Sequence, residues 1–375
     1  MLPLAGRAAT PYLSLMQLLD QITRPTLLAL ALCFAPGIAL GQGYANLAPE
    51  RADGYARVSR DTPIIFPQDH ATHPRFRNEW WYVTANLTGD DGADYGAQWT
   101  LFRTALRPGE DPGDWSSTQL WFAHAALTGA DFHAHAEKFA RGGVGTAGVR
   151  AAEAAAGGLD AWIDDWSLTG PTPAQLTMRG GGADFAYSLE LATSRPFVRQ
   201  GDNGFSLKTP TGQASHYYAQ PFFEVTGHIE HEGRRIAVTG RAWMDREWSS
   251  QILTEAQEGW DWFAFHLDET AKLMIGRMRN TDGTSFILGN WATQDGRSQE
   301  IPGDEVTLEP TRWTAIDDRE VPTSWRLSIP SRGVAVETEP LNPRAWMGTA
   351  FAYWEGPIRF TGSHEGVGYL EMTGY

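Results

Sequence analysis

The sequence predicts an all-β fold of antiparallel strands arranged as two related units in tandem. Its 375 residues include 40 Gly, 22 Pro and 16 Trp, a composition that suits many short strands joined by turns. Several segments alternate apolar and polar residues with a period of two, and part of the chain recurs near its C-terminus. Amphipathic helix patterns are scarce, so the residues favour a barrel or a sandwich.

The first 41 residues are expected to form a signal peptide. The apolar run 26–40 is about as long as the hydrophobic part of such a signal and too short to cross a membrane. Ala39 and Gly41 supply the small residues that precede a cleavage site. The run begins late, so translation could start at Met16.

Cysteine usage bounds the compartment and the chemistry. The only cysteine, Cys33, lies in the apolar run, so the mature chain would have neither disulfides nor thiol catalysis. Leu32 before it is not the small residue of a lipoprotein signal, so we expect no lipid anchor. Export without disulfides indicates a periplasmic or secreted protein, although an uncleaved N-terminal anchor would leave a similar pattern.

The charge of the chain disfavours several classes of partner and cofactor. A formal net charge of −15 with no polybasic run argues against nucleic acid and anionic membrane surfaces. The glycine-rich stretches 141–148 and 179–184 lack the strand-to-helix context of a phosphate-binding loop. We therefore expect no nucleic acid partner and no nucleotide cofactor.

The strands can be placed in order along the chain. After an extended leader over 42–60, residues 79–87 alternate, with Trp81 on one face and Tyr82 on the other. The turn at 89–94 leads into a returning strand over 95–106, which predicts a hairpin. Further strands are expected at 120–128, 161–170, 175–180, 185–193, 222–233 and 234–244. The Ala/Gly-rich segment 142–158 would be a loop or a short helix.

Two parts of the sequence echo each other. Residues 217–248 match 353–375, and 79–87 match 259–267. The matched positions are Pro221 with Pro357, Thr226-Gly227 with Thr361-Gly362, and Trp243-Met244-Asp245 with Tyr369-Leu370-Glu371. Alternation is lost over 249–258, so we place one unit at 61–250 and the other at 251–375.

Four stretches carry a resemblance to a known family. Residues 73–87, 215–229, 240–251 and 259–267 are similar to lipocalin-like secreted proteins that include AttH-type proteins, some of them called hydrolases, and carotenoid 1,2-hydratases. The likeness spans about residues 60–375. It implies two tandem lipocalin-like antiparallel β-barrels with an apolar ligand pocket in or between them.

The resemblance also implies an activity and a catalytic pair. Members with known activity hydrate isoprenoid or prenyl double bonds, with an acid matching Asp245 and a histidine matching His216. Trp243 stands where the hydratases tend to have Tyr, and Tyr218 where they have Trp, so a phenol has moved. The chain lacks a Gly-x-Ser-x-Gly elbow in a strand-to-helix context, so we do not carry over the hydrolase label.

Hydration of an alkene would require a carboxylic acid that keeps its proton near neutral pH. Burial beside Trp243 would raise the pKa of Asp245 in this way, because desolvation disfavours the carboxylate. Aromatic walls would stabilise the carbocation, and a second carboxylate or imidazole would accept a proton from water. Period-two geometry puts Asp245 and Arg246 on opposite faces, so the Asp245 face meets either solvent or a lumen.

Other candidates carry weaker signals. Glu79 could be the second carboxylate at a barrel mouth or the ion-pair partner of Arg75 or Arg77, which lie close by in sequence, and His216 could be structural. The expected substrate contacts are Trp243, Tyr218, Trp81, Glu79 and Trp260. His133 and His135 share a strand face, with His124 upstream, but they lack a fixed acidic or Cys partner, so no metal is expected.

Two hypotheses from different classes follow. The first is an exported enzyme that hydrates a double bond of an isoprenoid or lipid-like substrate, or performs a related lyase or isomerase step, without a cofactor. The second is a non-catalytic periplasmic lipid-binding component that works with an ABC transporter. The sequence does not indicate the oligomeric state.

Overall fold

The structure, a computed structural model, describes residues 52–151, 158–251 and 253–375 and confirms the all-β prediction. The predicted signal peptide lies outside these residues. The described strands form two antiparallel sheets, called here the first and second sheets. Among the described residues, the structure has no helix both long and apolar enough to cross a membrane.

The first sheet runs in the order β4-β3-β2-β1-β13-β12-β9-β8-β7-β6-β5, and β10 and β11 also pair with β12. Its strands are β1 (Asn78–Gly89), β2 (Asp94–Ala105), β3 (Gln119–Gly129), β4 (His133–Arg141), β5 (Ala147–Ala151), β6 (Leu159–Ile163), β7 (Trp166–Thr172), β8 (Gln175–Gly181), β9 (Phe185–Ala192), β10 (Val198–Arg199), β11 (Phe205–Leu207), β12 (Ala214–His231) and β13 (Arg234–Ser249). A short 3₁₀ turn, η2 (Gln68–His70), precedes β1.

The second sheet runs in the order β17-β16-β15-β14-β23-β22-β20-β19-β18, and β21 also pairs with β22. Its strands are β14 (Gln257–His266), β15 (Ala271–Asn280), β16 (Ser285–Thr293), β17 (Ser298–Ile301), β18 (Thr307–Ile316), β19 (Arg319–Ile329), β20 (Val334–Pro340), β21 (Trp346–Met347), β22 (Tyr353–Gly362) and β23 (Gly366–Thr373). The 3₁₀ turns η3 (Gly303–Glu305) and η4 (Pro330–Arg332) lie between strands.

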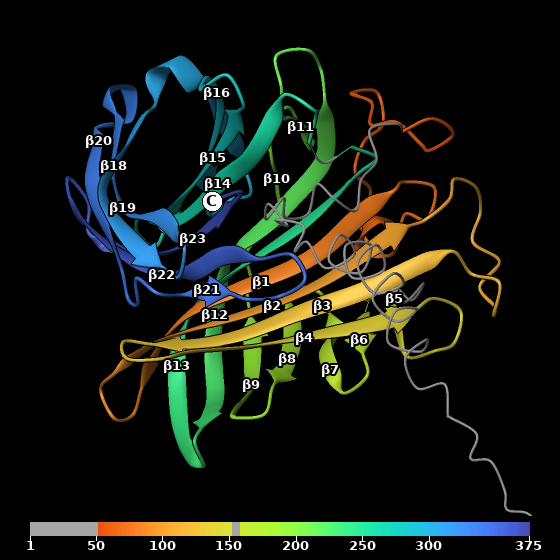
Figure 1. The fold of residues 1–375 in the computed structure, drawn as a ribbon, viewed down its shortest axis with the longest axis horizontal. Helices are drawn as coiled ribbons and strands as arrows, with labels where there is room; N and C mark the ends of the chain where they lie inside the picture. The colour runs from red at the N-terminus through yellow and green to blue at the C-terminus, as the bar shows by residue number, and fades with distance from the viewer. Residues whose placement is uncertain (1–51, 152–157, 252) are drawn as a thin grey trace, which may run out of the picture. The chain divides into compact units, whose positions relative to one another are not determined.

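The two sheets curl to different degrees. In Figure 1 the strands β14–β23 form a ring that is seen nearly end-on, whereas β1–β13 form a broad, curled sheet. The second sheet is therefore a nearly closed barrel and the first a curled half-barrel. Each carries its own apolar core, and the core of the first includes Trp81, Trp99 and Met244.

Because side chains alternate in direction along each strand, the two faces of a strand have different surroundings. On β1 the side chains of Trp81, Val83, Ala85 and Leu87 fill the core of the first sheet. The opposite face of the same strand turns toward the second sheet, because the Asn86 amide donates to the Gly368 carbonyl at 2.9 Å and Tyr82 donates to Glu355. Buried residues on both faces therefore follow from a strand covered on both sides.

The internal sequence repeat corresponds to a repeated order of strand pairing. In the first sheet β1 pairs with β2 and β13, and β13 pairs with β12. In the second sheet β14 pairs with β15 and β23, and β23 pairs with β22 in the same way. Gly227 and Gly362, matched in sequence, both have positive φ, at 148° and 135°. A Cβ on either would lie 2.3 Å from a carbonyl oxygen of the neighbouring strand.

Two expectations from sequence need correction. Residues 161–170 are not one strand but the hairpin of β6 and β7, with Asp164 and Asp165 as its exposed turn. Asp164 adopts positive φ there, a conformation that Asp tolerates in turns. In the segment 142–158, residues 147–151 form the strand β5, and 152–157 lie outside the described residues.

Replacing Gly227 by Ala tests why the repeated glycine is needed. We expect Gly227→Ala to lower the free energy of unfolding by about 1–3 kcal/mol, because it adds a left-handed strain and a clash with the Ser188 carbonyl. Gly233→Ala is the matched control, since its φ is 76° but no atom lies within 4 Å of the added Cβ. Urea unfolding of both variants measures the difference; equal losses would contradict the clash.

Candidate functional site

A cavity lies between the facing sides of the two sheets. The first sheet contributes a row of residues in register across four strands: Asp245 on β13, Tyr82 on β1, Thr100 on β2 and His124 on β3. All four line the cavity. Because the odd-numbered face of β13 meets the second sheet, Asp245 faces neither solvent nor the core of the half-barrel, but this covered space.

Asp245 is a buried carboxyl whose hydrogen-bond donors among the described residues are neutral. Its Oδ1 accepts a hydrogen bond from Trp243 Nε1 at 2.8 Å, and the Tyr217 hydroxyl also donates to it. Desolvation by burial raises the pKa of Asp245 well above its usual range, and these two hydrogen bonds only partly oppose the shift. Asp245 can therefore keep its proton near neutral pH.

Glu247, two residues further along the same face, has a different environment. Its Oε1 lies 2.8 Å from Lys208 Nζ and accepts a hydrogen bond from the Ser215 hydroxyl. Asp245 and Glu247 thus lie on the same strand face, but of the two only Glu247 takes part in an ion pair with a described residue.

The second sheet adds a pair of carboxyl groups. Glu355 and Glu371 are directly paired across β22 and β23 and share a hydrogen bond. Glu355 also accepts from the Tyr82 hydroxyl at 2.6 Å, and Glu371 from Trp260 Nε1 at 2.6 Å. Burial raises the pKa of Glu371 to about 7, and burial together with the nearby Glu371 raises the pKa of Glu355 well above its usual range. Glu371 lines the cavity and titrates near neutrality.

Aromatic and apolar side chains form most of the remaining wall. They come from both sheets and from the loop before β22: Trp80, Tyr82, Phe102, Tyr217, Trp260, Trp262, Met274, Met278, Leu288, Phe351 and Tyr353. Trp262 meets Trp243 and Tyr82 edge to face, with ring centroids 6.0 and 5.4 Å apart. Such a wall suits an apolar ligand, and its π faces suit a cationic group.

His124 connects the cavity to a carboxylate at the sheet edge. Its Nδ1 lies 2.9 Å from the Tyr353 hydroxyl, and its Nε2 lies 3.1 Å from Glu137 Oε1 on β4. Burial lowers the pKa of His124, which is therefore a neutral imidazole near pH 7. In the sequence, His124 carries only the weak signal of a possible metal ligand.

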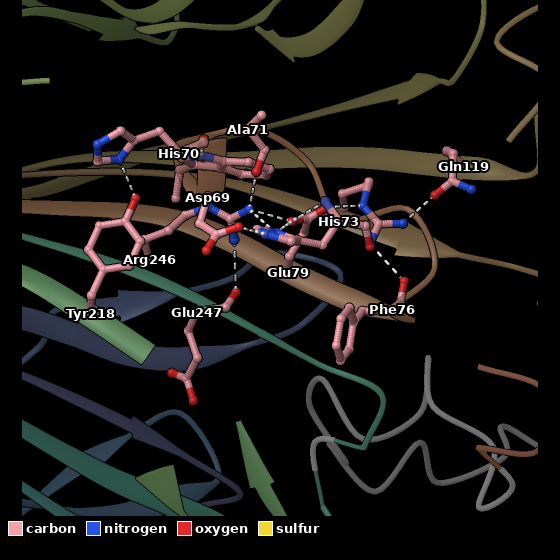
Figure 2. A network of polar contacts seen from close by, with 12 residues as sticks. Asp69, His70, Ala71, His73, Phe76, Glu79, Gln119, Tyr218, Arg246 and Glu247 are labelled. Carbon is pink, nitrogen blue, oxygen red and sulfur yellow. Dashed lines mark hydrogen bonds and ion pairs between the residues drawn. The ribbon is translucent and has the colours of Figure 1, made fainter. Parts of the chain in front are cut away.

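Four of the predicted site residues lie elsewhere, on the face of the first sheet that carries Arg246 and Trp248. Figure 2 shows two of them, Glu79 and Tyr218. Glu79 forms ion pairs with Arg103 and Arg246, all three buried, and also contacts His73. The two guanidinium groups hold the pKa of Glu79 well below its usual range against the cost of burial. Glu79 is therefore the anion of a structural network, but its ion-pair partners are Arg103 and Arg246 and not the neighbouring Arg75 or Arg77.

The other three surround this network. The Arg246 guanidinium lies over the Trp81 ring, 3.8 Å from its centroid, and the Tyr218 hydroxyl is 2.6 Å from His70 Nδ1. His216 packs against Trp248, with ring centroids 5.3 Å apart.

The structure does not bring together the catalytic pair that the resemblance implied. His216 pairs with Trp248 across β12 and β13, whereas Asp245 pairs with Ala219, so the two side chains lie on opposite faces of the first sheet. The predicted contacts that do surround Asp245 are Trp243, which donates to it, and Trp260, which lines the same cavity.

The histidines considered for a metal have other partners. His133 Nδ1 is 2.9 Å from the Thr128 hydroxyl, and the Gly348 N–H donates to His135 Nε2. Over the ranges that the structure describes, no group of three or more His, Cys, Asp or Glu side chains could hold a metal ion.

Comparisons with known proteins agree with this fold. The family model described as AttH-like matches residues 57–375, so the chain belongs to the AttH-like family. A protein from Nitrosomonas europaea assigned as an AttH has a crystal structure with a TM-score of 0.75 and 34% identity, covering 85% of this chain and 99% of that one. No curated protein sequence matches significantly.

A more distant structure shares the fold alone. Kievitone hydratase from Nectria haematococca aligns with a TM-score of 0.62 at 14% identity, covering 87% of this chain and 98% of that one. The fold that holds the cavity between two sheets is therefore shared with a protein named as a hydratase.

Removing the anion of the Glu79 network tests its structural role. We expect Glu79→Gln to lower the free energy of unfolding by about 3–5 kcal/mol, because it leaves two buried guanidinium groups without a carboxylate. The control is Glu337→Gln, which breaks an exposed pair with Arg326 and should cost at most about 1 kcal/mol. Denaturant unfolding compares them; similar losses would refute a structural role for Glu79.

Proposed function

We propose that this protein is a hydratase that adds water to a carbon–carbon double bond of an apolar, isoprenoid-like or lipid-like substrate bound between the two sheets. The observation that carries the proposal is Asp245, a buried carboxyl without a counter-ion in an aromatic cavity. Membership of the AttH-like family and a fold shared with kievitone hydratase support it.

In the first step Asp245 acts as a general acid. Its O–H bond breaks as a C–H bond forms on the less substituted alkene carbon, which leaves a carbocation on the other carbon. The rings of Trp80, Trp260 and Trp262 line the same cavity and would stabilise that cation through their π faces. The Asp245 carboxylate that forms receives hydrogen bonds from Trp243 and Tyr217.

In the second step water attacks the cation and loses a proton. Glu371 is the group we assign as its acceptor, because it lines the cavity from the second sheet and its pKa of about 7 suits proton transfer near neutral pH. Glu355 and Trp260 hold its carboxylate by hydrogen bonds. Elimination of water by the same groups in reverse is the corresponding lyase reaction.

We also propose that the chain is exported to the periplasm or secreted, on the strength of its N-terminal apolar run. Carriage of an unchanged lipid, in association with an ABC transporter, is the competing function. Native mass spectrometry of protein purified from its own cells separates the two: a stoichiometric lipid recovered unchanged supports carriage, and a product one water heavier supports hydration.

Replacing the acid tests the mechanism directly. Asp245→Asn should reduce turnover by about 10²–10⁴-fold, because an amide cannot protonate the alkene, while ligand binding and folding persist. The assay incubates the protein with isoprenoid alcohols and prenylated phenols in ¹⁸O-labelled water and detects the labelled alcohol by mass spectrometry. Asp304→Asn, at an exposed position, is the control. Full activity of Asp245→Asn would exclude this acid.

The pH dependence tests the second carboxyl. Because Glu371 must be deprotonated and Asp245 protonated, kcat/KM should rise as pH increases through about 7 and fall at higher pH. Glu371→Gln should abolish the rise near pH 7 and lower the rate by about 10²-fold. The exposed Glu300→Gln should leave the profile unchanged. A rise near pH 7 that survives in Glu371→Gln would assign the base to another group.

A further inference from the structure

The Tyr353–His124–Glu137 chain is not used by the proposed reaction, yet it ends on the cavity wall. Tyr353 and His124 both line the cavity, and Glu137 is reached through the buried imidazole. His124 is fully buried, and the Glu137 side chain is 20% exposed. A buried histidine held at both nitrogens has a defined tautomer, and that tautomer decides what the Tyr353 hydroxyl can offer a ligand.

Glu137 fixes the tautomer. Its carboxyl oxygens accept hydrogen bonds from the Ala350 N–H at 3.1 and 3.2 Å, and Oε1 lies 3.1 Å from His124 Nε2. An acceptor at Nε2 places the imidazole proton on that nitrogen, so Nδ1 carries a lone pair. The Tyr353 hydroxyl must then donate to Nδ1, 2.9 Å away.

With its proton committed to His124, the Tyr353 oxygen presents only lone pairs to the cavity. Burial raises the pKa of Tyr353 well above its usual range, so the group stays a neutral phenol. A buried acceptor in an apolar wall is costly unless a donor reaches it. The ligand group that satisfies it is a donor, such as a hydroxyl.

The row of residues across the first sheet gives the spacing between the acid and His124, the hydrogen-bond partner of this acceptor. Asp245 and His124 occupy one row on strands three positions apart in the sheet, with Tyr82 and Thr100 between them. At ~4.8 Å per strand the two positions are separated by ~14 Å. A ligand that reaches from one end to the other is therefore elongated.

We infer that the cavity takes an elongated apolar alcohol, whose hydroxyl donates to Tyr353 at one end while its double bond lies beside Asp245 at the other. This inference rests on the proposed function for the location of the double bond. The hydroxyl site itself depends only on the contacts of Tyr353, His124 and Glu137. It can therefore be tested by binding, without turnover.

The experiment compares farnesol with farnesyl methyl ether, which has the same chain but no donor. Binding is followed by the quenching of tryptophan fluorescence, because Trp80, Trp260 and Trp262 line the cavity. In the Asp245→Asn protein, which separates binding from turnover, farnesol should bind about tenfold more tightly than the ether. Equal affinities would overturn the inference and leave the proposed hydration intact.

Two variants separate hydrogen bonding from shape. Tyr353→Phe removes the acceptor and should abolish the preference for the alcohol, whereas a preference that survives would show that the ether methyl group is excluded by shape and would overturn the assignment. Met278→Leu replaces an apolar wall residue by one of similar volume and should change the affinities for both ligands by the same factor.

A third variant tests the tautomer. In Glu137→Gln the amide oxygen can keep the Ala350 hydrogen bond and its NH₂ can donate to His124 Nε2. The imidazole proton then moves to Nδ1, Nδ1 donates to Tyr353, and the phenol proton is released toward the cavity. The ether should gain affinity relative to the alcohol, so that the ratio of the two affinities falls toward one. A purely structural role for Glu137 would change both affinities equally and would overturn the tautomer argument.

Discussion

The arrangement of the site depends on keeping a buried cation away from a buried acid on the same strand. Asp245 and Arg246 are adjacent, and each is almost fully buried. The alternation of β13 sends Arg246 into the first sheet, where Glu79 neutralises it, and sends Asp245 toward the second sheet. Were Arg246 free to reach the acid, it would hold the carboxylate and lower its pKa. Glu79 therefore protects the acid without touching the cavity.

This division explains why several aromatic and charged residues of the conspicuous motifs do not surround the ligand space. The stretch around residues 73–81 supplies Glu79, His73 and Trp81, and each is engaged with Arg246. Their role is to close and stabilise the interior of the half-barrel. The cavity instead uses the faces of β1 and β13 that turn toward the nearly closed barrel.

Much of the fold could be predicted from the sequence because strand alternation and turn residues are local signals. The hairpin of β1 and β2 was accessible in this way, whereas Asp245 became the candidate acid only through the family resemblance. Which covered face of a strand meets a ligand depends on how the two sheets dock, and no local pattern encodes that. For this reason the sequence did not reveal that His216 and Asp245 lie on opposite faces of the first sheet.

The carboxyl pair shows what the repeat could have revealed. Glu371 follows Tyr369 as Asp245 follows Trp243, and the echo was open to a purely structural explanation. In the structure both acids line one cavity from opposite sheets, so the repeat brings two equivalent positions face to face. Glu355 had no such signal, because it becomes recognisable only when its pairing with Glu371 is known.

The closure of each sheet by its first and last long strands also has a consequence for how the chain reaches this state. Asn78 pairs with Ser249, and Asp261 with Met372, so neither sheet can be completed until the far end of its own segment is available. Such non-local pairing costs loop-closure entropy before the contacts it forms can stabilise the fold, and it makes folding slow. Asp245 on β13 and Glu371 on β23 both lie on the strand that is synthesised last in its sheet. The complete cavity would therefore be the last feature that a newly made chain acquires, and a truncated chain would expose unpaired strand edges instead of a partial cavity.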